Sequence, residues 1–459
     1  MKNIKLYLII LCSILCTMFL PCPEVFQIQT WKLFIFFCFA ILGIVLDLAE
    51  SYIVLLTFFI VAGLFRAITI DDSFTGFKNS TTWFLFIMLT ISNVIKNTSI
   101  IQRITSIFIK LCGRNIILLS YGLCFLEFFF SVMVPSNAAR ASSLGAPIVS
   151  SLSKSIHTKH KNINESQIGG YLSILYRYCN SICSAAFLTG ATANKIMLDI
   201  AKDFGSNITL VSWMKYTILP CIFLVMCLPF FVKLFINHGL KYCDIPCEIN
   251  KDAESKFNKD EKRIILVFLS MLLLWFFSDK IHVSMMTTAV LGFVVMVLFG
   301  LIKKDDIVDG DLLGSCATIG LFLCFVDQLS SGGFFNIVSD FVKPFVFMNN
   351  KFCSLMFLSF IYICTKLIFN SECAGAVAFY LLFIRIGVSI GLDINMLAMS
   401  LAFFNSIGTM ITHYSSTASP PICGLGYVSN KKWLLSGFCI SCLSYLVWFG
   451  YLFLFENSR

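Results

Sequence analysis

Apolar stretches of roughly 20 residues follow one another along almost the whole chain, separated by short polar or charged segments. They fall at 31–48, 52–70, 82–96, 115–152, 169–199, 213–236, 264–279, 283–302, 314–330, 353–393, 396–423 and 433–455. A helix needs about 20 apolar residues to cross the hydrocarbon core of a bilayer. The pattern therefore predicts an all-α polytopic membrane protein.

Two of these stretches are too long for one crossing, and each contains a polar break near its middle. Residues 115–152 are broken at Pro135-Ser136-Asn137, and residues 352–394 are broken at Asn370-Ser371-Glu372-Cys373. Unwound polar backbone is tolerated at membrane depth only where protein buries it or where it lines a cavity. We therefore expect re-entrant hairpins or discontinuous helices at about 115–152 and 353–393.

The helices after the two hairpins carry further polar interruptions, at residues 189–194 and 412–421. Half-helix N-termini offer free N–H groups to carboxylates, while unwound carbonyls and Ser, Thr and Asn oxygens suit a hard cation such as sodium. Alternatively, small polar residues only let the helices pack closely. Pro135 and Pro420-Pro421 disfavour that alternative, because proline removes backbone hydrogen bonds that another group must replace.

Ionisable residues inside these stretches are candidate functional residues. Arg140 either reaches water from the mouth of the first hairpin or pairs with a substrate carboxylate. Glu127 is a candidate for a structural partner and equally for a transport residue. For Arg177 and Lys366 the pattern favours interfacial anchoring over a place on the anion path.

The order of elements is the same on both sides of a polar insertion at 238–262. Each half has three helices, an amphipathic piece, a broken hairpin, an interrupted long helix and a final helix. An odd number of crossings in each half gives the two halves opposite topology, as in the inverted repeats of secondary transporters. We expect a first transmembrane helix in 1–30, a first inverted repeat in 31–237, a cytoplasmic linker in 238–262 and a second inverted repeat in 263–455.

The composition supports a place in the lipid bilayer. Of the 459 residues, 58% are hydrophobic and 13% are charged, with a mean hydropathy of +0.87, whereas soluble domains average about 25% charged residues. Lys and Arg in cytoplasmic loops account for the net charge of +9, so no nucleic-acid partner is expected. The same bias predicts a cytoplasmic N-terminus, and we expect a bacterial-type inner (plasma) membrane. The cysteines and histidines form no paired metal-ligand pattern, and no resident cofactor is expected.

Several motifs, in order along the chain, resemble the divalent-anion:sodium symporter family, specifically its citrate/2-oxoglutarate/malate (dicarboxylate) translocator branch. Val134-Pro135-Ser136-Asn137-Ala138-Ala139-Arg140 is similar to the first Ser-Asn-Thr hairpin motif of that branch. Ala186-Phe187-Leu188-Thr189 with Ala193-Asn194 is similar to its following unwound helix. Thr412-His413-Tyr414, Pro421-Ile422-Cys423-Gly424-Leu425-Gly426-Tyr427-Val428-Ser429 and Trp433 resemble its T-H-Y … P-I … G-x-G-Y-V … W signature.

The resemblance implies a homodimeric secondary transporter with eleven transmembrane helices and two re-entrant hairpins, whose transport domain moves against a scaffold domain as an elevator. It implies that Ser136, Asn137, Ser371 and Cys373 face the organic anion. The hairpin tips, including Ser136, Asn137 and Ser371, would also bind sodium if transport is coupled to that ion. Thr189, Asn194, Thr417 and Ser419 would lie in or near the ion sites.

Two departures from the family pattern bear on the substrate and the coupling. Ala138 stands where the motif has threonine, which removes one hydroxyl ligand. Glu372, in Ser371-Glu372-Cys373, places a carboxylate at the second tip, where it repels a dicarboxylate unless it is protonated or holds a cation. The usual substrate and the usual sodium stoichiometry therefore do not follow from the resemblance, and another anion, such as an inorganic oxyanion, is the alternative cargo.

An enzyme or sensor embedded in the membrane is a weaker hypothesis. Paired acids, a histidine cluster, a nucleophile motif and a sizeable soluble domain are all missing from the sequence. The sequence also lacks the G-x-x-x-x-G-K-[ST] motif of a nucleotide-binding domain, which excludes an ATP-driven pump.

Overall fold

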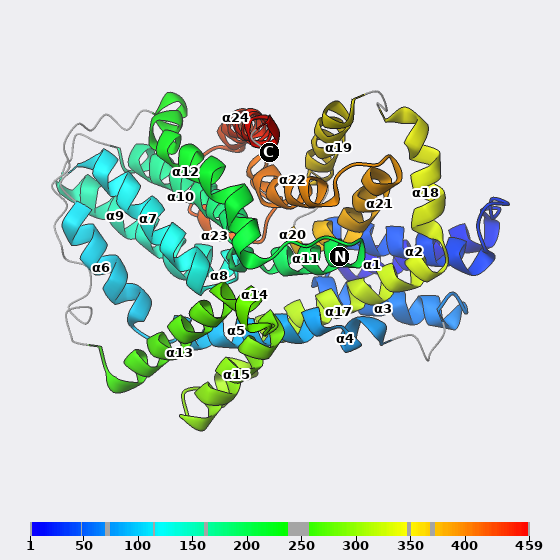
Figure 1. The fold of residues 1–459 in the computed structure, drawn as a ribbon, viewed down its shortest axis with the longest axis horizontal. Coiled ribbons are helices and arrows are strands. Elements are labelled where there is room, and N and C mark those ends of the chain that lie inside the picture. Colours follow the sequence, from blue (N-terminus) through cyan, green and yellow to red (C-terminus); the bar gives the residue numbers. More distant parts are fainter. Residues whose placement is uncertain are drawn as a thin grey trace. The chain divides into compact units, whose positions relative to one another are not determined.

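The computed structural model describes residues 2–46, 48–68, 74–112, 115–159, 164–236, 257–346, 350–367 and 372–457. All regular elements in these ranges are helices (Figure 1). The chain divides into two compact units. Unit 1 comprises Met1–Phe86, Ile196–Ser206 and Ile307–Leu401, and unit 2 comprises Ile87–Lys195, Asn207–Asp306 and Ala402–Arg459. Each unit therefore takes helices from both halves of the sequence.

Unit 1 is built around the long helix α17 (Gly310–Ser331), which packs against α2, α3 and α4. Gly76 of α4 lies so close to α17 that a Cβ there would meet the carbonyl oxygen of Gly320 at 2.1 Å. The helices of this unit, besides α17, are α1 (Lys2–Phe19), α2 (Ile28–Val45), α3 (Ser51–Leu64), α4 (Thr75–Lys78), α18 (Phe334–Val342), α19 (Lys351–Thr365), α20 (Glu372–Gly375) and α21 (Leu381–Ser389). Four helices cross a unit boundary: α5 (Ser80–Lys96), α11 (Thr192–Asp203), α16 (Lys304–Ile307) and α22 (Ile394–Ile407).

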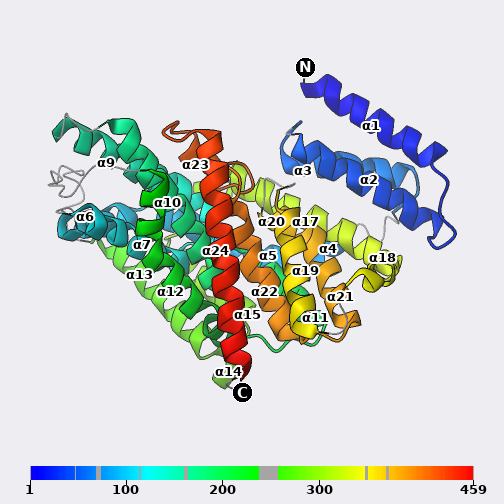
Figure 2. The same ribbon diagram turned by 90° about the horizontal axis from the view of Figure 1, so that it is seen from above.

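Unit 2 is built around α10 (Glu165–Ala186), which lies beside α7, α9 and α12 (Figure 1). All its residues from Ile168 to Ala186 are buried, although several are polar. Helix α12 also runs alongside α24 (Figure 2). The other helices of this unit are α6 (Ile100–Cys112), α7 (Ile116–Met133), α8 (Asn137–Arg140), α9 (Ala146–Lys159), α12 (Leu210–Phe235), α13 (Lys259–Phe276), α14 (Ser278–Ile281), α15 (Met285–Leu298), α23 (Ser419–Cys423) and α24 (Asn430–Asn457).

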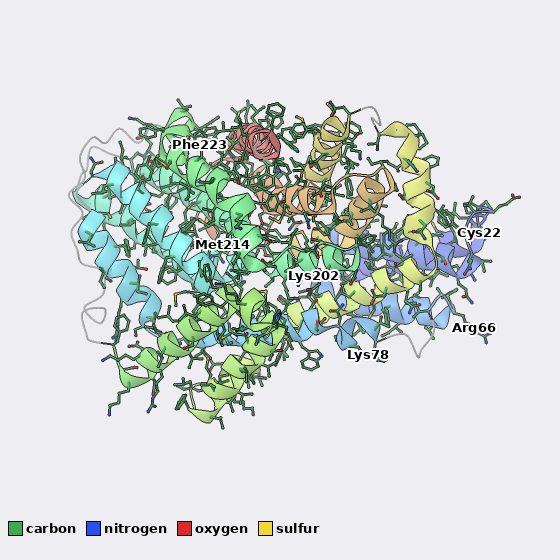
Figure 3. The ribbon with its side chains drawn as sticks, in the orientation of Figure 1. Cys22, Arg66, Lys78, Lys202, Met214 and Phe223 are labelled. Carbon is green, nitrogen blue, oxygen red and sulfur yellow. The ribbon has the colours of Figure 1, made fainter. Side chains whose placement is uncertain are left out.

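Five helical stretches in the described ranges are long and apolar enough to cross a bilayer: Ile28–Val45, Ile116–Met133, Leu210–Phe235, Lys304–Ser331 and Asn430–Leu454. Helix α12 also shows the expected lipid-facing surface. Its exposed apolar side chains recur at helical spacing, at Leu219, Phe223, Met226 and Phe230, and Phe223 (Figure 3) is 52% exposed. A soluble protein rarely exposes such a stripe, so α12 has the surface of a helix that contacts lipid.

The two predicted hairpins have the same internal layout. In the first, Asn115 is the N-cap of α7, which begins at Ile116. Helix α8 then begins at Asn137, and a π-helical turn, η1, spans Ala141–Gly145. In the second, Asn350 is the N-cap of α19, which begins at Lys351. Helix α20 then begins at Glu372, and a π-helical turn, η5, spans Ala376–Tyr380. π-helical turns are rare, and these two lie at matching places in the two segments.

Some boundaries differ from those expected from the sequence. Helix α13 begins at Lys259, inside the predicted linker 238–262, because Asn258 and Glu261 form a capping box that starts the helix there. The larger part of that linker lies outside the described residues. Helix α2 begins at Ile28, and the second arm of the first hairpin continues to Lys159, beyond the predicted end at 152.

Candidate substrate and ion site

The first hairpin tip lies in unit 2 and joins α7 to α8 through Val134, Pro135 and Ser136. Proline has no N–H group and so ends the helical hydrogen bonding of the first arm. Ser136 is the N-cap of α8, and its hydroxyl accepts a hydrogen bond from the N–H of Ala139 at 3.2 Å. The side-chain oxygen of Asn137 accepts one from the N–H of Ala138 at 2.9 Å. These two hydrogen bonds cap the first turn of a continuous helix from Asn137 to Lys159, whose dipole is positive at the tip.

Arg140 is fully buried, and the protein itself engages its guanidinium. Its Nε donates to Glu127 Oε1 at 2.7 Å. Its Nη1 donates to the carbonyl oxygens of Val134 at 2.5 Å and Gly190 at 2.9 Å, and its Nη2 donates to Ser184 Oγ at 2.9 Å. Arg140 is therefore shielded from water, which excludes one of the two roles considered from the sequence, and its pairing with a substrate carboxylate stays a prediction.

Glu127, on α7, is the counterion of Arg140 and is also fully buried. It accepts two further hydrogen bonds, from the Tyr176 hydroxyl at 2.5 Å and from Asn180 Nδ2 at 2.7 Å. Burying a charge pair is tolerated when each partner's remaining hydrogen-bonding groups are satisfied. The structure therefore makes Glu127 a structural partner, which is one of the two roles that the sequence left open.

The first helix interruption follows α10 and consists of Phe187, a 3₁₀ turn at Leu188–Gly190 (η2) and Ala191. Asn194, at the start of α11, closes this segment, since its Nδ2 donates to the carbonyl oxygens of Ser184 and Phe187 at 2.8 Å each. Thr189 lies within the 3₁₀ turn and is buried. The side-chain oxygens of Asn180 and Asn194 are buried without a hydrogen-bond partner. Buried polar atoms of this kind are costly, and oxygens are the atoms that bind hard cations.

The second interruption separates α22 from α23 and includes a 3₁₀ turn at Gly408–Met410 (η6) and an irregular segment at 411–418. Arg177 of α10 reaches this segment. Its guanidinium donates to Ser419 Oγ at 2.9 Å, to both oxygens of Thr409 at 3.3 Å, and to Ser181. Ser419 is fully buried, whereas Thr417 is exposed. Arg177 is thus a buried cation that connects α10 to the second interruption. This differs from the sequence-based expectation that it lies at the membrane interface.

The second hairpin tip lies in unit 1, and Ser371 is outside the described residues. Glu372 opens α20 and is buried, and Cys373 beside it is half-buried. Lys366, at the end of α19, is 1% exposed, and its ammonium donates to the Tyr362 hydroxyl at 3.1 Å. Lys366 and Glu372 interact electrostatically. The second tip therefore places a lysine in the same hairpin as the carboxylate that departs from the family pattern.

The loop between α23 and α24 packs on the first turn of α10. The Tyr427 hydroxyl donates to Glu165 Oε1 at 2.9 Å, and the Tyr427 ring covers Gly169, where a Cβ would approach the ring to 2.5 Å. Burial, and next the bond to the Glu165 carboxylate, raises the pKa of Tyr427. This packing gives the Gly-x-Gly-Tyr-Val motif a structural role at the start of α10.

Unit 2 brings together most of the residues predicted for the site: Ser136, Asn137, Arg140, Thr189, Asn194, Thr417 and Ser419. Glu372 and Cys373 belong to unit 1. Sequence reasoning missed Tyr176, Asn180, Ser184 and Thr409. A signal for the first three was present, because they recur every four residues along the helix and so share one face.

Interrupted helices in an all-helical membrane protein are typical of secondary transporters. The fold agrees, since the YdaH transporter of Alcanivorax borkumensis has a similar structure, with a TM-score of 0.58 at 10% identity, covering 86% of this chain and 89% of that one. Over residues 1–456 the chain matches the sodium:sulfate symporter transmembrane region. The chain belongs to this family. It is a multi-pass transmembrane anion transporter and not an enzyme.

Named relatives match over nearly the full chain. The putative malate transporter YflS of Bacillus subtilis is 29% identical over 94% of this chain and 91% of its own length. The chloroplastic dicarboxylate transporter 2.2 of Arabidopsis thaliana is 25% identical over 98% of this chain and 83% of its own length. The inner membrane protein YbhI of Escherichia coli is 27% identical over 96% of this chain and 94% of its own length.

Proposed function

We propose that the protein is a secondary active transporter of di- or tricarboxylates of the 2-oxoglutarate, malate, succinate or citrate type. The observation that carries the proposal is the meeting of three elements in unit 2: the N-terminal end of the Asn137–Lys159 helix, the interruption after α10 and the interruption before α23. A helix N-terminus attracts carboxylates, and unwound backbone offers oxygens to a cation. The names of the malate and dicarboxylate transporters among the relatives support the same cargo.

In this proposal Ser136 and Asn137 of the first hairpin tip bind substrate carboxylates, and the family resemblance gives the same role to Ser371 and Cys373 of the second tip. Transport is either anion exchange or symport with a cation, which is sodium if the transporter is ion-coupled. The residues present fit such an ion, because the side-chain oxygens of Asn180 and Asn194 are buried without partners. Oxygens of Thr189, Thr417 and Ser419, with those of the hairpin tips, complete the set of candidate ligands.

We further propose that the chain is built from two inverted repeats that follow a first transmembrane helix, with eleven transmembrane helices and two hairpins in all. The matched layout of the two hairpins supports this reading. Alternating access would then proceed by an elevator movement of a transport domain against a scaffold domain. A homodimer in a bacterial-type inner membrane, with a cytoplasmic N-terminus, completes the proposal.

Glu372 favours one second candidate, a carrier of an inorganic oxyanion with altered coupling. The Ser371-Glu372-Cys373 tip departs from the family pattern, and a carboxylate beside an anion site is unfavourable unless its charge is balanced. When it is protonated, Lys366 of the same hairpin balances the charge of Glu372. For that reason we retain carboxylates as the proposed cargo.

Binding to the purified protein separates the two cargoes. A ligand that binds the folded protein stabilises it and so raises its melting temperature. At a ligand concentration of 100 times the Kd, the free energy of unfolding rises by about 2.7 kcal/mol. We expect malate, 2-oxoglutarate, succinate or citrate to stabilise the protein in a thermal-shift assay, with sulfate, phosphate and nitrate as matched anions. Stabilisation by an inorganic oxyanion alone would replace the proposed cargo.

Glu372→Thr restores a hydroxyl at the second tip. We expect this variant to change the dependence of transport on the coupling cation or the preference among carboxylates by about tenfold, because it removes a buried negative charge beside Lys366. The measurement is initial uptake into proteoliposomes across a range of sodium concentrations, next to the wild type. The exposed Asp260→Asn is the matched control. Unchanged substrate preference and ion dependence would show that Glu372 does not act on the site.

A further inference from the structure

Arg140 connects four separate parts of unit 2 through one side chain. Its guanidinium bonds Glu127 on the first hairpin arm, the Val134 carbonyl at the start of the tip, Ser184 near the end of α10 and the Gly190 carbonyl inside the first interruption. Arginine has five N–H donors in a rigid planar fork. Four of them are directed at these groups, so the relative placement of tip and interruption depends on this fork.

The same connections reach the two unpartnered oxygens. Asn180 donates a hydrogen bond to Glu127, the counterion of Arg140. Asn194 donates to the carbonyl of Ser184, and the Ser184 hydroxyl accepts a hydrogen bond from Arg140. The Ser184 hydroxyl in turn donates to the Asn180 carbonyl at 2.7 Å. A change at Arg140 therefore alters the position of both candidate ion ligands without touching either.

The π-helical turn η1 directly follows Arg140 and is held by the same cluster. A π-turn interrupts the regular i to i−4 ladder, and side-chain hydroxyls meet carbonyls at this point. Ser143 Oγ donates to the Ala139 carbonyl at 2.6 Å, and the Tyr176 hydroxyl lies 3.2 Å from the Arg140 carbonyl. The Tyr176 ring packs against Gly145, where a Cβ would approach it to 2.1 Å. Tyr176 thus joins Glu127 to the π-turn and fixes the helix behind the tip.

We propose that Arg140 is a positioning residue of the transport site. With Glu127 it locks the first hairpin tip and the first helix interruption into one arrangement, so that ligands from both are in place when substrate arrives. It acts through Ser184, Gly190 and the two asparagines and does not itself contact the substrate. The transport readout rests on the proposed function, whereas the structural readout does not.

Amide hydrogen exchange by mass spectrometry on the full-length protein in detergent gives the structural readout. In Arg140→Lys the charge remains but a single ammonium cannot reach all four partners. We expect exchange about tenfold faster both in peptides covering 134–145 and in peptides covering 187–194, since the two segments open together. Peptides of α24 should exchange as in the wild type.

Two variants keep this test decisive. Arg263→Lys alters an arginine of the same unit whose ion pair with Asp260 is solvent-exposed, and it should change neither segment. Ser184→Ala removes one bond of the cluster and should accelerate both segments by a smaller factor, even if Arg140→Lys does not fold. Acceleration at the tip alone, or at neither segment, in the folded variants would overturn the proposal.

Transport kinetics distinguish positioning from direct contact. If Arg140 positions the site, Arg140→Lys raises the half-saturating concentration by the same factor for dicarboxylates and for their singly charged analogues, with a maximal rate within about threefold of the wild type. If Arg140 contacts a substrate carboxylate, the loss is confined to the substrates that carry that carboxylate. A wild type that carries no organic anion contradicts the proposed function, and hydrogen exchange then decides the positioning role alone.

Discussion

Replacing Glu127 with alanine is expected to destabilise the protein by about 3–5 kcal/mol, the usual cost of leaving one charge of a buried pair without its partner. Arg140 would remain fully buried without its counterion, and Tyr176 and Asn180 would each lose an acceptor. The measurement is the melting temperature and the yield of monodisperse protein in detergent, and we expect a fall of about 5 °C or more.

The matched control for Glu127→Ala is Asp260→Ala, which removes the acid of an exposed ion pair. The side chains of Arg263 and Asp260 are 49% and 67% exposed and lie 3.2 Å apart. Exposed pairs and charges at a helix N-terminus are each worth about 1 kcal/mol or less. If both variants melt at the wild-type temperature, the buried cluster does not stabilise unit 2 as the structure indicates.

Gly437→Ala in α24 is expected to abolish transport and to destabilise unit 2 by about 1–3 kcal/mol, the range for overpacking a filled interior. A Cβ at Gly437 would lie 2.0 Å from the carbonyl oxygen of Met410 and 2.9 Å from the Cα of Ile411. These are backbone atoms at the start of the second interruption, so they can move only if that segment shifts. Melting temperature and uptake into proteoliposomes measure the two effects.

The same helix provides the control for Gly437→Ala. A Cβ at Gly450 meets nothing within 4 Å, so Gly450→Ala should leave transport unchanged and stabilise the helix by up to about 1 kcal/mol through better helix propensity. Equal behaviour of the two variants would contradict the close approach of α24 to the second interruption.

The sequence was sufficient for the features that depend on local composition. Apolar runs near the length of a bilayer crossing predicted the all-helical membrane fold, and Pro135 marked the first tip because proline ends the hydrogen bonding of a helix. The interruption at 189–194 was predicted for a similar reason, since polar residues there break an otherwise apolar run. The family membership was also predicted from motifs, and the match over residues 1–456 confirms it.

Most partners of the buried charges could not be predicted, because they lie far apart in the chain. Arg140 pairs with Glu127 on the other arm of its hairpin and bonds Ser184 and Gly190, which follow some 50 residues later. Arg177 reaches Ser419, far along the chain. Contacts between residues so far apart in the chain depend on how α10 packs between the other elements. That packing cannot be derived from the local pattern of a single sequence.

The cluster also explains why α10 can be both polar and buried. Along this helix Tyr176, Asn180 and Ser184 share one face, and Arg177 and Ser181 share another, because residues four apart lie one above the other. The first face bonds the hairpin cluster and the second bonds the interruption before α23. Most of these polar groups therefore bond a segment that the proposed mechanism needs in a defined place, and the side-chain oxygen of Asn180 is left as a candidate ion ligand.

The central claim, that this protein carries di- or tricarboxylates by secondary transport, is tested most directly by counterflow in proteoliposomes. Vesicles containing the purified protein are loaded with unlabelled malate or 2-oxoglutarate and diluted into a trace of the labelled compound, with and without sodium. We predict transient accumulation of label in loaded vesicles, and none in vesicles that lack the protein or are loaded with sulfate alone. Failure to take up any organic anion under any imposed gradient would contradict the account.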